Sequence, residues 1–243
     1  MRSNSEWIYW GRVDPLWAVA ALEGREQGAP NAWTAADFLA MGDSDMADVA
    51  RHWQSYGVSR GRCIEIGCGS GRMTKALLAH FDSVLAIDVS PDQIRSAATL
   101  LGEDAQRVSF ALVSTAAIPA ADASCDAMFS SHVFQHLSDF SHVERYFAES
   151  FRCLRHGGTI CFHLPVPGAH RTSEHPSIWY LVRSAKVAIK RMLGQLAVMD
   201  YRRYAASRVF GALERVGYED CQLRIFSMRS NGDAHSYFFA RKP

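Results

Sequence analysis

Residues 63–78 read CIEIGCGSGRMTKALL, an apolar run that leads into three closely spaced glycines and then into a helix-like segment. The glycines are Gly67, Gly69 and Gly71, and glycine permits positive φ angles and a close approach of backbone to ligand. A helix that begins near Arg72 would direct its unbonded N–H groups towards the same place. The stretch predicts a strand, a ligand-binding turn and a helix, although a tight turn without a ligand would use the same residues.

A carboxylate ends the next apolar run. Asp88 follows the glycines by about 20 residues, and an acid at this strand end can accept both hydroxyls of a ribose. Alternatively, Asp88 is an ordinary acid at a helix N-terminus and binds no ligand. Ser90, Pro91 and Gln93 form a capping box that predicts a helix at this point. The glycine pattern is G-x-G-x-G, whereas dinucleotide folds prefer G-x-G-x-x-G. Together the two features favour S-adenosylmethionine (SAM) over a nicotinamide dinucleotide.

From residue 63 onwards, short apolar runs alternate with helix-like stretches, which predicts βαβ units around a parallel sheet. Apolar residues at helical spacing from Phe140 to Leu154 predict an amphipathic helix that stops at Gly157 and Gly158. Two strand-like runs, CQLRIFSM and HSYFFAR, enclose a turn sequence at residues 230–233. We expect these runs to form a terminal antiparallel hairpin.

Composition restricts the classes of partner. The 243 residues include 26 basic and 25 acidic side chains, so a net charge of +1 gives no reason to expect a nucleic acid or a membrane surface. We therefore expect a small-molecule partner. Six cysteines without C-x-x-C spacing, and an N-terminus without a signal-like apolar stretch, favour a cytoplasmic location. The sequence carries no signal for an oligomeric state.

Residues 61–164 resemble the class I SAM-dependent methyltransferases of the small-molecule type. The resemblance implies an α/β fold with a Rossmann-like, mostly parallel seven-stranded sheet, a terminal antiparallel hairpin, helices on both faces, an N-terminal helical cap and an insertion after the fifth strand. We expect residues 1–57 to form the cap segment and residues 58–243 the SAM-binding domain, with residues 165–203 as an acceptor-site insertion. That insertion carries a basic run, which could attract an acidic acceptor or simply face solvent.

The resemblance also assigns cofactor contacts. The glycine turn would face the methionine part of SAM with Glu65 behind it, Asp88 and its neighbour would hold the ribose, the end of the third strand would hold the adenine, and two serines would line the cofactor after the fourth strand. Many family members have an aspartate where this chain has Ser114, so the adenine contact falls to the Ser114 hydroxyl or the Thr115 backbone. The implied cofactor residues are Glu65, Gly67, Cys68, Gly69, Gly71, Asp88, Val89, Ser114, Thr115, Ser130 and Ser131.

Methyl transfer from a sulfonium is an in-line displacement, so a base is needed only when the acceptor keeps its proton. His136, and after it His132, follow the fourth strand and are the candidate catalytic bases, although a structural role is commoner for any one histidine. Their four-residue spacing also suits two metal ligands, to which His170 and His175 could add. Because no carboxylate accompanies them in an H-E-x-x-H arrangement, we expect no metal site.

The sequence thus predicts a SAM-dependent methyltransferase that modifies a hydroxyl of a metabolite, sugar or natural-product intermediate in biosynthesis. N-methylation or C-methylation of a small molecule is an alternative with the same fold. A dinucleotide-dependent oxidoreductase and a non-catalytic SAM-binding protein are alternatives from other classes. The glycine spacing argues against the oxidoreductase, and the serine at position 114 keeps the binding protein open.

Overall fold

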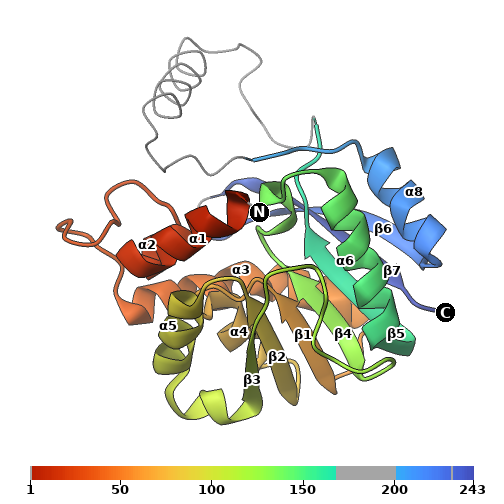
Figure 1. Cartoon of the computed structure of the whole chain (residues 1–243), viewed down its shortest axis with the longest axis horizontal. Helices are drawn as coiled ribbons and strands as arrows, with labels where there is room; N and C mark the ends of the chain where they lie inside the picture. Colours follow the sequence, from red (N-terminus) through yellow and green to blue (C-terminus); the bar gives the residue numbers. More distant parts are fainter. Residues whose placement is uncertain (1, 168–200, 231) are drawn as a thin grey trace.

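The computed structural model of the chain describes residues 2–167, 201–230 and 232–243 (Figure 1). A seven-stranded sheet in the order β3-β2-β1-β4-β5-β7-β6 lies at its centre, and β7 runs in the direction opposite to the other six strands. This arrangement confirms the predicted mostly parallel sheet with a terminal hairpin. The strands are β1 (Arg62–Ile66), β2 (Ser83–Asp88), β3 (Val108–Leu112), β4 (Cys125–Ser130), β5 (Leu154–His163), β6 (Glu219–Ser227) and β7 (Ala234–Arg241).

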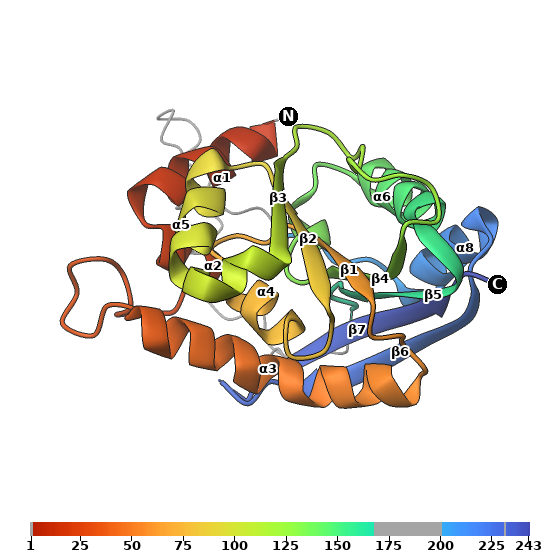
Figure 2. The ribbon, with the colours of Figure 1, turned by 90° about the horizontal axis from the view of Figure 1, so that it is seen from below.

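The helices cover both faces of the sheet (Figure 2). One core cluster joins the sheet to α6 and α8, and a second joins the opposite face to α3 and α4. Parallel strands covered on both faces are buried along nearly their whole length, as β1, β2 and β4 are. The helices are α1 (Arg2–Val13), α2 (Pro15–Val19), α3 (Ala35–Ser55), α4 (Arg72–Leu77), α5 (Pro91–Leu101), α6 (Phe140–Cys153) and α8 (Ala206–Val216), with 3-10 turns η1 (Gly102–Arg107) and η2 (Phe134–His136).

Register brings the ends of the three central strands together. Ile66, the last residue of β1, pairs with Ile87 on one side and with Ser130 on the other. The segments that leave β1, β2 and β4 therefore start side by side at the carboxyl edge of the sheet, where open α/β folds bind their ligands. The glycine turn, Asp88 and the residues after β4 all belong to this edge.

The three N-terminal helices take up two different positions. In Figure 1, α1 and α2 lie above the sheet, and their contacts reach the segments that follow β1, β2 and β3. The longer helix α3 instead packs against a face of the sheet, where the Trp53 indole Nε1 donates a buried 2.8 Å hydrogen bond to Thr159 Oγ1 of β5. Only the first part of the segment predicted as a cap thus covers the carboxyl edge.

The predicted stop of α6 is wrong. The helix ends at Cys153 and passes directly into β5, while Gly157, at φ +75°, lies inside that strand. Pairing of Cys125 with Leu154 and a 2.8 Å hydrogen bond from the Ser124 N–H to the Cys153 carbonyl hold the chain extended from this point. Sheet pairing therefore overrides the helical spacing that continues to Leu154.

The predicted acceptor-site insertion, residues 165–203, falls mainly on residues 168–200, which lie outside the described residues. Its two flanks are described, and both contact the carboxyl edge. The Tyr204 N–H donates to the Pro165 carbonyl at 3.2 Å, and the Arg202 N–H donates to the Gln135 carbonyl at 2.8 Å. Among the helices formed by the described residues, none is long and apolar enough to cross a membrane.

A buried ion pair joins α3 to the start of α4. Arg72 Nη1 lies 2.9 Å from Asp45 Oδ2, and 5% and 7% of the two side chains are exposed. Asp45 also accepts the Ser230 N–H through Oδ1 at 3.3 Å. The pair fixes the helix that follows the glycine turn, because a buried charge is stable only beside its partner.

We predict that Asp45→Ala lowers the free energy of unfolding by roughly 3–5 kcal/mol, because it leaves the Arg72 charge buried and unpaired. Asp48→Ala is the matched control, since Asp48 lies on the same helix and forms surface ion pairs with Arg51 and Arg229. Urea unfolding of both variants measures the difference. Equal midpoints for the two variants would contradict this role of the buried pair.

Candidate active site

The glycine turn between β1 and α4 has the conformation that the sequence predicts. Gly67 and Gly69 have φ angles of +76° and +52°, which residues other than glycine rarely adopt. Space is also restricted, because a Cβ on Gly67 would lie 2.2 Å from Val133 Cγ2 and one on Gly69 would lie 2.5 Å from Val19 Cγ2. The turn is therefore enclosed by the segment after β4 and by α2, and glycine is required at both positions.

Asp88 is linked to this turn directly. Its Oδ2 accepts the Gly69 N–H at 2.8 Å, and its Oδ1 accepts the Ser90 N–H at 2.9 Å. Burial raises the pKa of Asp88, while these N–H donors and that of Val89 oppose the shift. Each carboxylate oxygen has a second lone pair, so Asp88 can still accept hydroxyl groups from a ligand. The helix-supporting role considered from the sequence is therefore compatible with a ligand-binding one.

Glu65 lies in β1 beneath the turn, with only 2% of its surface exposed. Its Oε2 accepts a 2.6 Å hydrogen bond from the Thr74 hydroxyl in α4. Burial raises the pKa of Glu65 to about 7, and the hydrogen bond from Thr74 opposes that rise. The carboxyl group thus links β1 to α4, the two elements that the glycine turn connects.

The predicted adenine-binding residues follow β3 beneath α1. Ser114 is exposed, and its carbonyl accepts a hydrogen bond from the Asn4 amide at 3.1 Å. The Thr115 carbonyl accepts the Tyr146 hydroxyl at 3.4 Å. A Cβ on Gly11 of α1 would lie 2.4 Å from Ser90 Oγ, so α1 also contacts the start of α5. The helix α1 therefore bridges the segments that the sequence assigned to ribose and adenine.

The two serines after β4 have different partners. Ser130 is buried, and its hydroxyl donates to the Ile66 carbonyl at 3.1 Å, which fixes the end of β4 beside the end of β1. Ser131 Oγ lies 3.1 Å from the Tyr237 hydroxyl of β7. Ser130 thus acts first as a link between strands, whereas Ser131 connects the edge to the terminal hairpin.

The two candidate bases lie in different surroundings. His136, in η2, has its Nε2 3.0 Å from the Gln135 amide nitrogen, and its ring meets Trp7 of α1 edge to face at 5.0 Å. His132 instead packs against His163 and His235, with ring centroids 4.2 and 4.9 Å away. Sequence reasoning did not single out Trp7, Asn4 or His235, and no spacing rule could have joined residues so far apart in the chain.

We predict that wild-type protein without cofactor loses stability relative to Glu65→Gln as the pH rises from about 4.5 to about 7. In that range the folded state retains the proton on Glu65 and the unfolded state releases it, so unfolding becomes easier by about 3 kcal/mol. Urea unfolding at a series of pH values measures the difference, with Glu103→Gln on the exposed η1 as a control for the substitution. Parallel curves for wild type and Glu65→Gln would contradict the raised pKa.

Comparison with known proteins agrees with this geometry. A family profile described as "Methyltransferase domain" matches residues 64–162. Over 99 residues the chain is 35% identical to a malonyl-[acyl-carrier protein] O-methyltransferase of Hahella chejuensis. That match covers 40% of this chain and 34% of the relative, so the chain spans about a third of the curated relative it matches.

Solved structures share the fold at low identity. Phosphoethanolamine N-methyltransferase 2 of Haemonchus contortus, solved with S-adenosyl-L-methionine, is 15% identical with a TM-score of 0.60 and covers 86% of this chain and 57% of its own. The [4+2]-cyclase SpnF is 17% identical with a TM-score of 0.63 and covers 99% of this chain and 96% of its own. Residues 64–162 thus match a methyltransferase domain, in a chain that shares its fold with a solved methyltransferase that holds S-adenosyl-L-methionine.

Proposed function

We propose that the protein binds SAM at the carboxyl edge of its sheet and transfers the methyl group to a small-molecule acceptor. The observation that carries this proposal is the direct contact between the glycine turn and Asp88, at the adjoining ends of β1 and β2. A turn of glycine backbone with a carboxylate beside it suits the charged amino acid and the ribose of SAM. The family match over residues 64–162 and the solved neighbour that holds SAM support the same cofactor.

In this proposal the residues from Gly67 to Gly71 receive the methionine part and Asp88 with Val89 receives the ribose. Ser114 and Thr115 receive the adenine, in a position that α1 partly covers through Asn4. When bound, SAM supplies an electrophilic methyl group on a sulfonium. The protein's part is to align the acceptor with that methyl group and to exclude water from the two.

The acceptor side is proposed to lie between α1, η2 and the flanks of residues 168–200. His136 lies beside Trp7 in this region. The Arg202 N–H donates to the carbonyl of Gln135, the residue that precedes His136. We propose a hydroxyl acceptor with His136 as the base that removes its proton. The relatives do not decide the acceptor atom, because one is named an O-methyltransferase and another an N-methyltransferase.

A second candidate function keeps the cofactor fold without methyl transfer. It is favoured by one observation, namely that the solved neighbour matching 99% of this chain is named a [4+2]-cyclase. A shared fold does not determine the reaction, because function depends on the residues of the site. The reaction product therefore decides between methyl transfer and a reaction without it. Incubation of the purified protein with SAM and a panel of small metabolites tests both functions.

We expect S-adenosylhomocysteine and a product heavier by one methyl group, both detected by mass spectrometry, with at least one acceptor. Asp88→Ala is the matched inactive control for this assay. An acceptor that is converted without any S-adenosylhomocysteine would contradict methyl transfer and favour the second function.

We predict that Asp88→Ala weakens SAM binding by at least about 100-fold, because two hydrogen bonds to a charged group, worth about 1.5–3 kcal/mol each, are lost. Asp92→Ala is the control, since Asp92 lies in the first turn of α5 and pairs with the exposed Arg95. Calorimetry with S-adenosylhomocysteine and its 2′-deoxy analogue sharpens the test. Wild type should discriminate between the two ligands and Asp88→Ala should not, whereas equal discrimination would refute the ribose contact.

For the acceptor, we predict that His136→Ala lowers turnover by about 10²- to 10⁴-fold, the usual contribution of a general base, and leaves SAM affinity unchanged. Steady-state kinetics on the acceptor found above, with calorimetry for SAM, measure both quantities. Full turnover in this variant would contradict a base-dependent hydroxyl acceptor and favour an amine or an activated carbon.

A further inference from the structure

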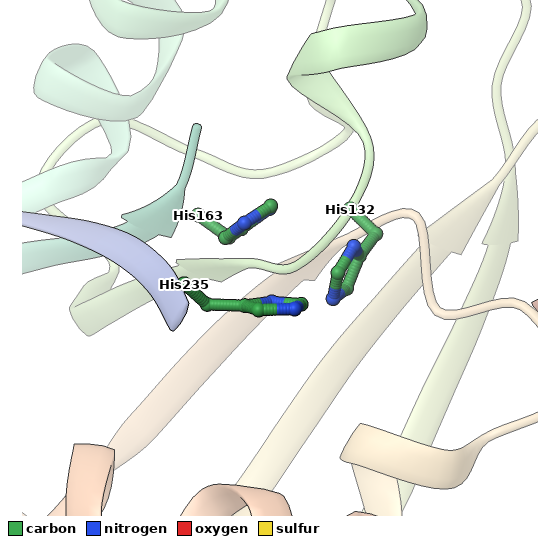
Figure 3. Close-up of side chains that lie close together, drawn as sticks. All are labelled: His132, His163 and His235. Atoms are coloured by element: carbon green, nitrogen blue, oxygen red, sulfur yellow. The ribbon is translucent and has the colours of Figure 1, made fainter. Parts of the chain in front are cut away.

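Three histidines converge at the carboxyl edge, beside the proposed cofactor site (Figure 3). His132 follows β4, His163 ends β5 and His235 lies at the start of β7. Because β7 runs antiparallel to β5, its first residues meet the last residues of β5, as the pairing of His163 with Tyr237 shows. The topology of the sheet therefore assembles three side chains that are far apart in the sequence.

The geometry of this histidine cluster resembles a set of metal ligands. One ring nitrogen from each histidine can be chosen so that all three lie within 4.8 Å of one another. Metal–nitrogen bonds of about 2.0–2.1 Å in a tetrahedral site place their nitrogens roughly 3.3 Å apart, so small rotations of the side chains would suffice. Figure 3 shows the three side chains directed towards a common region.

Burial and backbone conformation distinguish the cluster from a group of surface histidines. His163 is 1% exposed, and His132 and His235 are partly buried. His132 also has a φ of +59°, which is uncommon for a residue other than glycine and occurs often at functional sites. The His132 ring lies beside that of His163, at a centroid distance of 4.2 Å.

We propose that His132, His163 and His235 bind a divalent transition-metal ion of the Zn²⁺ type. Neutral imidazole nitrogens are preferred ligands of such ions, and a site with three histidines leaves a fourth position for water or for an oxygen of another ligand. The expectation of no metal site came from the pair His132 and His136, whose rings have different neighbours in the structure. The metal site does not depend on the proposed function, because the ion can be measured without SAM or an acceptor.

The test uses the full chain without a histidine tag, stripped with a chelator and then titrated with Zn²⁺ by calorimetry. We expect one equivalent of Zn²⁺ per chain. Loss of a residue that only supports a ligand usually weakens metal binding 10–100-fold, so loss of a ligand should weaken it by at least about 100-fold. His235→Asn and His132→Asn are the variants, the latter because asparagine tolerates a positive φ.

His156→Gln is the matched control, since His156 is an exposed histidine at the opposite end of the same strand that His163 ends. Circular dichroism and a thermal midpoint confirm that each variant is folded. Co²⁺ provides a second readout, because its visible absorption bands report coordination by nitrogen ligands in a four-coordinate site. These bands should appear with wild type and His156→Gln, and should be lost in the two asparagine variants.

Three results would overturn the proposal. The first is that the stripped wild-type protein binds no stoichiometric Zn²⁺ in the titration. The second is a pair of folded asparagine variants that bind Zn²⁺ as tightly as wild type does. The third is an equal loss of binding in His156→Gln, which would indicate adventitious binding to surface histidines.

Discussion

The hydrogen bond from the Gly69 N–H to the Asp88 carboxylate links the turn after β1 to the end of β2. This contact exists only because parallel pairing brings Ile66 next to Ile87, so that both strands end at the same level. The carboxylate then holds two backbone N–H groups, from Gly69 and Ser90, and still has lone pairs for a ligand. The shape of the turn and the position of the charge are thus fixed together.

Other parts of the molecule constrain the same turn from outside. Val133 and Val19 approach it so closely that a side chain on Gly67 or Gly69 would collide with them. The Ser70 hydroxyl donates to Gln93 Oε1 at 2.6 Å, which joins the turn to α5. The Gln93 amide in turn donates to the Pro15 carbonyl at 3.1 Å, so the start of α2 belongs to the same network. The helix α2 is therefore bound directly to the glycine turn and to α5, and does not form an independent unit.

Much of this fold could be predicted because its signals are local. The glycine spacing, the capping box at Ser90 and the terminal turn each fix a strand end or a helix start within a few residues, and the structure has a helix starting at Arg72 and at Pro91. The end of α6 could not be predicted in the same way, because pairing between Cys125 and Leu154 is not local. Local signals determine where elements begin, while sheet pairing decides where this one ends.

The residues of the candidate site likewise fall into those with local sequence signals and those brought together only by the fold. Residues of the glycine turn and Asp88 lie within one βαβ unit, so their spacing carries information about the ligand. The partners of His132 and His136 come from β5, β7 and α1, and only the folded topology reveals them. This is why the sequence could rank the two histidines as bases but could not separate their surroundings.

We propose that the carboxyl edge of this sheet binds a SAM-type nucleoside and not a dinucleotide. Calorimetric titration of the purified wild-type chain with SAM, with S-adenosylhomocysteine and with NADH tests it most directly. We predict saturable one-to-one binding of the first two ligands in the micromolar range and no binding of NADH. Saturable binding of NADH, or the absence of any heat with both SAM and S-adenosylhomocysteine, would contradict it.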